Sequence, residues 1–197
     1  IAAFLTRGKG YYEQYKADED YGKYNLPYPV NGNDTIFNSD FIRQLWLDNY
    51  FYGSVFSLQY KSAKTQATLG GGLTCYDGKH YGKILWATNG LTGLDSWYNL
   101  DALKKDFNIY GKQQTEIRNG LLLFYDLQYR LVNYAINGFR DNPSLIIRNQ
   151  WHFFNPKAGI TYKRNNWKTY LSFGVANKEP NRDDFEAGAA QQPSPEK

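Results

Sequence analysis

The sequence has few of the residues that carry catalytic, metal-binding or redox chemistry. Its 197 residues include one cysteine, two histidines and no methionine. The lone Cys75 excludes an intramolecular disulfide bond. His80 and His152 lie far apart, and neither belongs to the HExxH or CxxC patterns that mark zinc sites. Since no acid–base pair emerges from the spacing of the other titratable residues, we expect no enzyme activity, no metal site and no cofactor.

The sequence also lacks any long hydrophobic run. A transmembrane helix needs about 20 consecutive apolar residues, whereas a barrel strand needs only about 10 residues of alternating polarity. The sequence contains no apolar run long enough for a transmembrane helix. Its composition does not exclude the strands of a membrane barrel. The chain begins at Ile1 rather than at Met, and it shows no signal peptide. We therefore expect this chain to be part of a longer protein.

Neither sign of charge is concentrated in one region. The 23 basic and 19 acidic side chains give a net charge of +4 and are spread along the chain. A nucleic-acid-binding protein would carry a basic stripe with aromatic residues on one element. No such stripe is found, so we expect no nucleic-acid partner.

Aromatic residues, in contrast, are abundant. The chain has 18 Tyr, 12 Phe and 5 Trp, which make up 18% of its residues. Aromatic residues favour strands over helices. Tyrosine suits surfaces that meet both an apolar phase and water, because its ring is apolar and its hydroxyl is polar.

An alternation of apolar and polar residues with period two recurs along the chain. It is clearest at 121–133, where odd positions up to 131 hold Leu and Tyr and the even positions 126, 128 and 130 hold Asp, Gln and Arg. A helix would mix these two sets on every face. Weaker segments of the same kind lie at 3–15, 50–60, 66–75, 107–116, 156–163 and 170–176. The sequence therefore predicts an all-β fold of about seven strands.

The connections between these segments differ in length in a regular way. Short connections lie at 61–64, 118–120 and 164–166. Long connections lie at 16–45, 77–106 and 138–150. Short and long connections alternate, as expected for a barrel with tight turns at one rim and long loops at the other. We predict antiparallel up-and-down hairpins from a large transmembrane β-barrel.

The long connection at 77–106, together with Tyr76 just before it, holds the best candidates for ligand binding. The stretch from Tyr76 to Lys83 combines aromatic residues, cations and glycines, and two tryptophans follow. Binding residues concentrate on loops that a rigid scaffold positions. We therefore predict that extracellular-loop residues contact a ligand, namely Tyr76, His80, Trp86 and Trp97.

Four segments resemble those of a known family. TRGKGYYEQYK at 6–16 resembles the T-x-G-x-G-Y-Y-E-Q-Y-K strand of TonB-dependent outer-membrane receptors, especially those of Bacteroides-type bacteria. FFNPKAGITY at 153–162 resembles their F-x-P-K-x-G-I-x-Y strand, and YLSFGVANKEPNRDDF at 170–185 resembles a strand that runs up to an extracellular loop. PSPEK at 193–197 resembles K-P-E-K, which leads into a further strand. Lys178 stands where Arg is commoner in the family.

The resemblance implies a plugged barrel of about 22 strands in the cell outer membrane. Such a receptor actively imports a scarce nutrient, for example a ferric siderophore, haem or cobalamin. Its partners would be the nutrient ligand, the outer-membrane lipid and, through the plug, the inner-membrane TonB complex. We expect residues 1–197 to be a middle fragment of the barrel domain, without the plug and the C-terminal strands.

Two other classes of protein are alternatives to a transporter. The alternative function is a small, non-transporting outer-membrane or ligand-binding β-barrel, which needs an even number of strands and ends that meet. A soluble β-sheet enzyme would need a cluster of acid, base or metal-binding residues. The reading frame on either side of this chain would distinguish a transporter from a small barrel.

Overall fold

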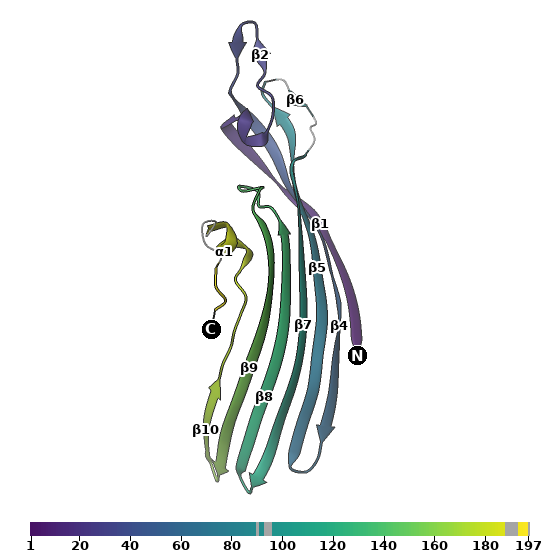
Figure 1. Cartoon of the computed structure of the whole chain (residues 1–197), viewed down its shortest axis with the longest axis vertical. Helices are drawn as coiled ribbons and strands as arrows, with labels where there is room; N and C mark the ends of the chain where they lie inside the picture. The colour runs from purple at the N-terminus through teal and green to yellow at the C-terminus, as the bar shows by residue number, and fades with distance from the viewer. Residues whose placement is uncertain (90, 93–95, 188–192, 197) are drawn as a thin grey trace.

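The computed structural model describes residues 1–89, 91–92, 96–187 and 193–196. The chain is all-β, with 75% strand and 5% helix. Seven strands form one antiparallel up-and-down sheet in the order β1-β4-β5-β7-β8-β9-β10 (Figure 1). Their bounds are β1 (Ala2–Asp20), β4 (Asn38–Lys61), β5 (Thr65–Ala87), β7 (Ser96–Arg118), β8 (Leu121–Asn137), β9 (Ile146–Arg164) and β10 (Trp167–Gly174). The prediction of an all-β hairpin architecture with about seven strands is confirmed.

Shorter elements lie outside this path. They are the 3-10 helix η1 (Tyr21–Tyr24), the strands β2 (Val30–Asn31), β3 (Asp34–Thr35) and β6 (Leu91–Thr92), and the helix α1 (Arg182–Ala187). β2 and β3 form a small hairpin of their own, and β6 pairs with the end of β5. Among the described residues, no helix has the length and apolarity to cross a bilayer.

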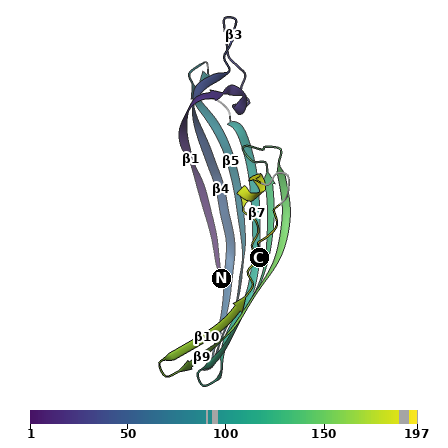
Figure 2. The ribbon, with the colours of Figure 1, turned by 90° about the vertical axis from the view of Figure 1, so that its left-hand side faces the viewer.

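Three tight turns lie together at one end of the sheet, which we call the turn rim (Figures 1 and 2). They connect β4 to β5, β7 to β8 and β9 to β10, as the sequence predicted. Gly120 and Asn165 have φ angles of 75° and 51° in two of these turns. Glycine and asparagine adopt such angles at low cost, which explains why they stand there.

The longer connections lie at the opposite end, which we call the loop rim, but the sequence placed their bounds wrongly. The connection predicted at 16–45 spans only 21–37, because β1 and β4 extend into it. The one predicted at 77–106 is mostly strand, since β5 ends at Ala87 and β7 begins at Ser96. The third spans 138–145. Strand pairing depends on backbone hydrogen bonds, which continue where the apolar–polar alternation ends.

The register gives the sheet two chemically different faces. Leu131 of β8 lies opposite Phe107 of β7 and His152 of β9, so these three residues share a face. Following this parity across the sheet defines the apolar face, whose exposed members include Leu5, Tyr52, Phe56, Leu58, Tyr60, Leu69, Leu73, Phe107, Ile109, Leu123, Tyr125, Leu127, Phe154, Ile160, Trp167, Leu171 and Phe173. The other face, the polar face, includes Asp126, Gln128, Arg130 and Lys157.

Two clusters of buried apolar residues lie at the loop rim. One cluster packs η1 against the ends of β4 and β5, with Tyr21, Tyr24, Phe41, Ile84 and Ala87. The second cluster packs α1 and the 138–145 connection against β8 and β9, with Ile136, Phe139, Ile147 and Phe185. The wall below these clusters is a single layer of curved strands (Figure 2).

Candidate functional site

The apolar face carries an uncharged band of similar length on neighbouring strands. On β4 it runs from Tyr60 to Tyr50 and is followed by Asp48, and on β5 it runs from Thr65 to Cys75. On β8 this face carries no charge between Leu121 and Asn137. At about 3.3 Å per residue, the stretch 50–60 is roughly 33 Å long. A monomeric soluble protein seldom exposes so large a continuous apolar patch.

Charged residues and aromatic rings meet where this band ends toward the loop rim. Asp48 forms ion pairs with Arg7 at 3.4 Å and Lys9 at 3.1 Å. Two strand positions further along β4, the Trp46 ring lies between those of Tyr11 and Tyr81, with centroid distances of 4.5 and 5.7 Å. The band therefore has a sharp boundary marked by amphipathic rings and ion pairs.

On the polar face, the segment after β10 crosses the sheet and is fixed by an ion-pair network. Glu179 accepts hydrogen bonds from Lys104 at 2.7 Å and from Arg130 at 2.7 and 3.0 Å. Arg130 also donates to Asp106. Glu179 is only 4% exposed, so both its oxygens are satisfied away from water. Of the segment 170–185, for which the resemblance implies a strand that runs up to a loop, residues 170–174 belong to β10.

A cleft of about 250 Å³, which we call the helix cleft, lies between α1 and the polar face. Its lining includes Tyr12, His80, Tyr98, Arg140 and Arg182. Arg182 stacks on Phe139 at 4.9 Å, and its buried Nε has no hydrogen-bond partner in the part of the chain that the structure describes. The cleft thus combines aromatic walls with cationic side chains from distant parts of the chain.

A second pocket of about 240 Å³, which we call the rim pocket, adjoins the helix cleft through Arg140 and Asp141. It is lined by Lys23, Tyr24, Arg43, Trp97, Arg140 and Asp141. Arg43 is 8% exposed and lies against the rings of Tyr24 and Trp97, each 5.9 Å from its guanidinium carbon. β4, β7, η1 and the 138–145 connection therefore all contribute to one pocket.

Hydrogen bonds connect Arg43 to the other side chains of the rim pocket. Arg43 donates from Nε and Nη2 to Gln14 at 3.1 and 2.9 Å, and from Nη1 to the Tyr24 hydroxyl at 3.1 Å. Tyr24 donates in turn to Glu19 at 2.7 Å, and Glu19 pairs with Lys23 at 2.9 Å. Burial and the hydrogen bond to Glu19 raise the pKa of Tyr24 to about 12, so the phenol stays protonated near neutral pH.

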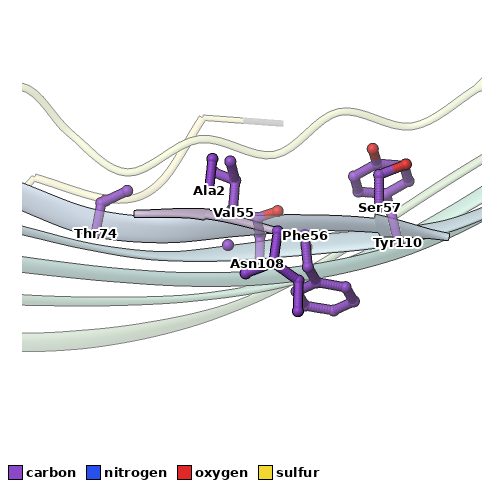
Figure 3. A pocket seen from close by; sticks show the side chains of 10 residues that line it. Ala2, Val55, Phe56, Ser57, Thr74, Asn108 and Tyr110 are labelled. Atoms are coloured by element: carbon purple, nitrogen blue, oxygen red, sulfur yellow. The ribbon is translucent and has the colours of Figure 1, made fainter. Parts of the chain in front are cut away.

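A third, shallower hollow of about 430 Å³ lies in the middle of the wall (Figure 3). Figure 3 shows Ser57 and Thr74 on one side of the sheet and Phe56 on the other. Gly71 and Gly72 also line it, and an added Cβ at Gly71 would lie 2.5 Å from the Asn108 carbonyl oxygen, so the neighbouring strand is close at this position. No side chain in its lining carries a charge, so it offers fewer groups for recognition than the two pockets at the loop rim.

The four predicted ligand-binding residues lie in strands, so their placement in a loop is wrong. Tyr76, His80 and Trp86 belong to β5, and Trp97 belongs to β7. His80 lines the helix cleft and Trp97 lines the rim pocket, so the fold brings these two to adjoining sites. Tyr76 packs its ring over Gly78, and Trp86 pairs with Ile42 and Thr92 at the end of its strand. Neither of these two lines the helix cleft or the rim pocket.

Sequence reasoning missed the charged residues of both pockets. Arg43 falls within the stretch 16–45 that the sequence predicts as a long connection, although it shares a parity with Phe41 and Leu45. That alternation was the available signal for an inward-facing arginine. Arg140 and Arg182 gave no signal, because only the fold brings their segments next to the strands.

The described part of the chain contains no group of three or more His, Cys, Asp or Glu residues that could hold a metal ion. No protein-family model matches this sequence, and no curated protein matches it.

Proposed function

We propose that this chain is part of the wall of an outer-membrane active transporter of the TonB-dependent receptor class. The transporter would import a scarce nutrient, such as a ferric siderophore, haem or cobalamin. The polar face would line a wet lumen, and the loop rim would face the cell exterior. A plug and an energy-coupling complex in the inner membrane would be its partners.

The uncharged band on the apolar face is the observation that carries this proposal. A strand stretch of roughly 33 Å tilted by about 40° spans about 25 Å along the membrane normal, which is the height of the apolar band on transmembrane barrels. The opposite face bears Asp126, Arg130 and Lys157, as expected beside water. The alternation of tight turns and longer connections fits the same architecture.

Two neighbouring substitutions on β8 test the membrane assignment. Leu127 lies on the apolar face and Gln128 on the polar face. Arginine introduced at these two positions therefore differs mainly in the face of the sheet on which it lies. We expect Leu127→Arg to destabilise the vesicle-inserted protein by about 2–4 kcal/mol. Gln128→Arg should have little effect in the same urea titrations with lipid vesicles. Equal effects of the two substitutions would contradict a lipid-facing apolar surface.

Transport itself needs a test in cells. Deleting the gene that encodes this chain should abolish energy-dependent uptake of one labelled nutrient among ferric siderophores, haem and cobalamin. Unchanged uptake of all three, together with normal membrane insertion, would favour a barrel that binds or anchors without transport.

A further inference from the structure

We infer that the rim pocket binds the carboxylate or phosphate group of a ring-bearing ligand, with the anion on Arg43 and Arg140 and the ring against Trp97. This inference rests on the proposed function, because it assigns a ligand class to the loop rim of the transporter wall. Three observations support it: the charge balance of the pocket, the unused donors of Arg43 and the position of the aromatic rings.

The charges around the rim pocket do not balance. Its lining carries three cations, Lys23, Arg43 and Arg140, and one carboxylate, Asp141. Asp141 pairs with Arg140 at 3.2 Å. Glu19, just behind the lining, pairs directly with Lys23 and reaches Arg43 only through the Tyr24 hydroxyl. Among the described residues, one positive charge therefore has no carboxylate of its own, and a buried cation in that state is costly unless a partner arrives.

Arg43 also keeps hydrogen-bonding capacity for a ligand. A guanidinium has five N–H donors, and the bonds to Gln14 and Tyr24 use three of them. Within the described residues, one N–H on each terminal nitrogen, Nη1 and Nη2, is left over. Two such donors can bind both oxygens of a carboxylate or two oxygens of a phosphate.

The rings of the pocket restrict the ligand further. Trp97 contacts Tyr24 edge to face at 5.1 Å and Tyr98 at 5.0 Å, so neighbouring aromatic rings hold it in place. Tyr98 itself lines the helix cleft, which continues from the rim pocket past Arg140. An anion held at Arg43 would thus have an aromatic surface beside it and about 250 Å³ of further cleft for the rest of the ligand.

Fluorine NMR on the full chain tests this inference. The chain is labelled with 5-fluorotryptophan, solubilised in detergent, and the Trp97 resonance is assigned by its loss in Trp97→Phe. The probes are benzoate and inorganic phosphate at constant ionic strength, with benzyl alcohol as the uncharged counterpart of benzoate. We expect a saturable shift of the Trp97 resonance with at least one anion and no saturable shift with benzyl alcohol.

Substitutions then assign the response to the pocket. Arg43→Gln should weaken anion binding at least tenfold, and Arg140→Gln, at a more exposed position, should weaken it less. Arg164→Gln makes the same charge change at the turn rim and should leave affinity unchanged. The other four tryptophan resonances report whether each variant is folded. If Arg43→Gln unfolds the protein, Arg140→Gln decides, because an unchanged affinity in that variant overturns the inference.

The inference is also overturned if neither anion gives a saturable shift, or if folded Arg43→Gln binds as tightly as the unsubstituted chain. The outcome is independent of membrane insertion. Anion binding by a chain that fails to insert into vesicles would leave the site standing and contradict the transporter. Insertion into vesicles without anion binding would contradict the proposed site and leave the transporter assignment standing.

Discussion

At the scale of single residues, close contacts between strands determine where side chains can stand. Gly53 of β4 lies so near β5 that an added Cβ would be 2.2 Å from the Leu73 carbonyl oxygen. At Gly111 of β7, an added Cβ has nothing within 4 Å. Both glycines lie inside strands, yet only the first is required by the approach of another backbone.

This difference leads to a matched pair of substitutions. Gly53→Ala should destabilise the protein by about 1–3 kcal/mol, because the two strands have to move apart. Gly111→Ala should change stability by less than about 1 kcal/mol, and a small gain is expected from reduced freedom of the unfolded chain. Denaturant titrations of both variants in the same lipid measure the free energy of unfolding. A Gly53→Ala variant as stable as Gly111→Ala would refute the close contact.

At the scale of elements, Glu179 fixes the segment after β10 to the polar face. Burial raises the pKa of Glu179, but hydrogen bonds from Lys104 and Arg130 outweigh it, so the pKa lies below the ordinary value of 4.5. A lowered pKa in the folded state means that the ionised carboxylate stabilises the segment above pH 4.5. This stabilisation is lost as the pH falls through the lower folded-state value.

We therefore expect segment 175–187 to detach from the sheet on the acid side of pH 4.5, while β8 and β9 stay protected. Amide hydrogen exchange, corrected for the pH dependence of the intrinsic rates, measures the protection of segment 175–187 and of β8 and β9. At pH 7, Glu179→Gln should reproduce the acid effect, since it removes the negative charge that pairs with Lys104 and Arg130. Lys178→Gln is the control, because the bonds of Lys178 to Glu196 use only backbone atoms. Unaltered protection in Glu179→Gln would show that the ion pairs do not hold the segment.

At the scale of the whole molecule, tryptophans report how the sheet is oriented. Trp167 is 80% exposed on the apolar face at the turn rim, whereas Trp151 lies on the polar face against Phe185. In vesicles of brominated lipid, the fluorescence of a chain with only Trp167 should be strongly quenched. A chain with only Trp151 should be quenched little, because its indole is on the far side of the wall. Equal quenching of the two would contradict the assignment of the faces.

Much of the wall could be predicted from the sequence because period-two alternation is a local property. The strand at 121–133 and the tight turns at 118–120 and 164–166 were correct, since side-chain parity and positive φ depend on neighbouring residues only. The strand ends at the loop rim were predicted wrongly, although side-chain parity offered a signal in β4. There Phe41, Arg43 and Leu45 share one parity, and a charged residue among apolar ones conceals the alternation.

The ligand-binding candidates show the same division between local and distant information. His80 and Trp97 were recognised by residue type, and the fold places both beside pockets. Tyr76 and Trp86 were chosen for the same reason and line neither of those two pockets. Residue type indicates what a side chain can bind, whereas the register and the path of the connections decide which side chains meet.

The sequence by itself determined the strand class, the two-faced character of the wall and the rim at which the tight turns lie. Only the tertiary structure decided that Arg43, Arg140 and Trp97 share a pocket and that Glu179 folds back onto Lys104 and Arg130. The physical reason is the distance along the chain over which each interaction acts. Alternation and turn conformation act between adjacent residues, while a pocket or an ion-pair network depends on segments that only the paired sheet brings together.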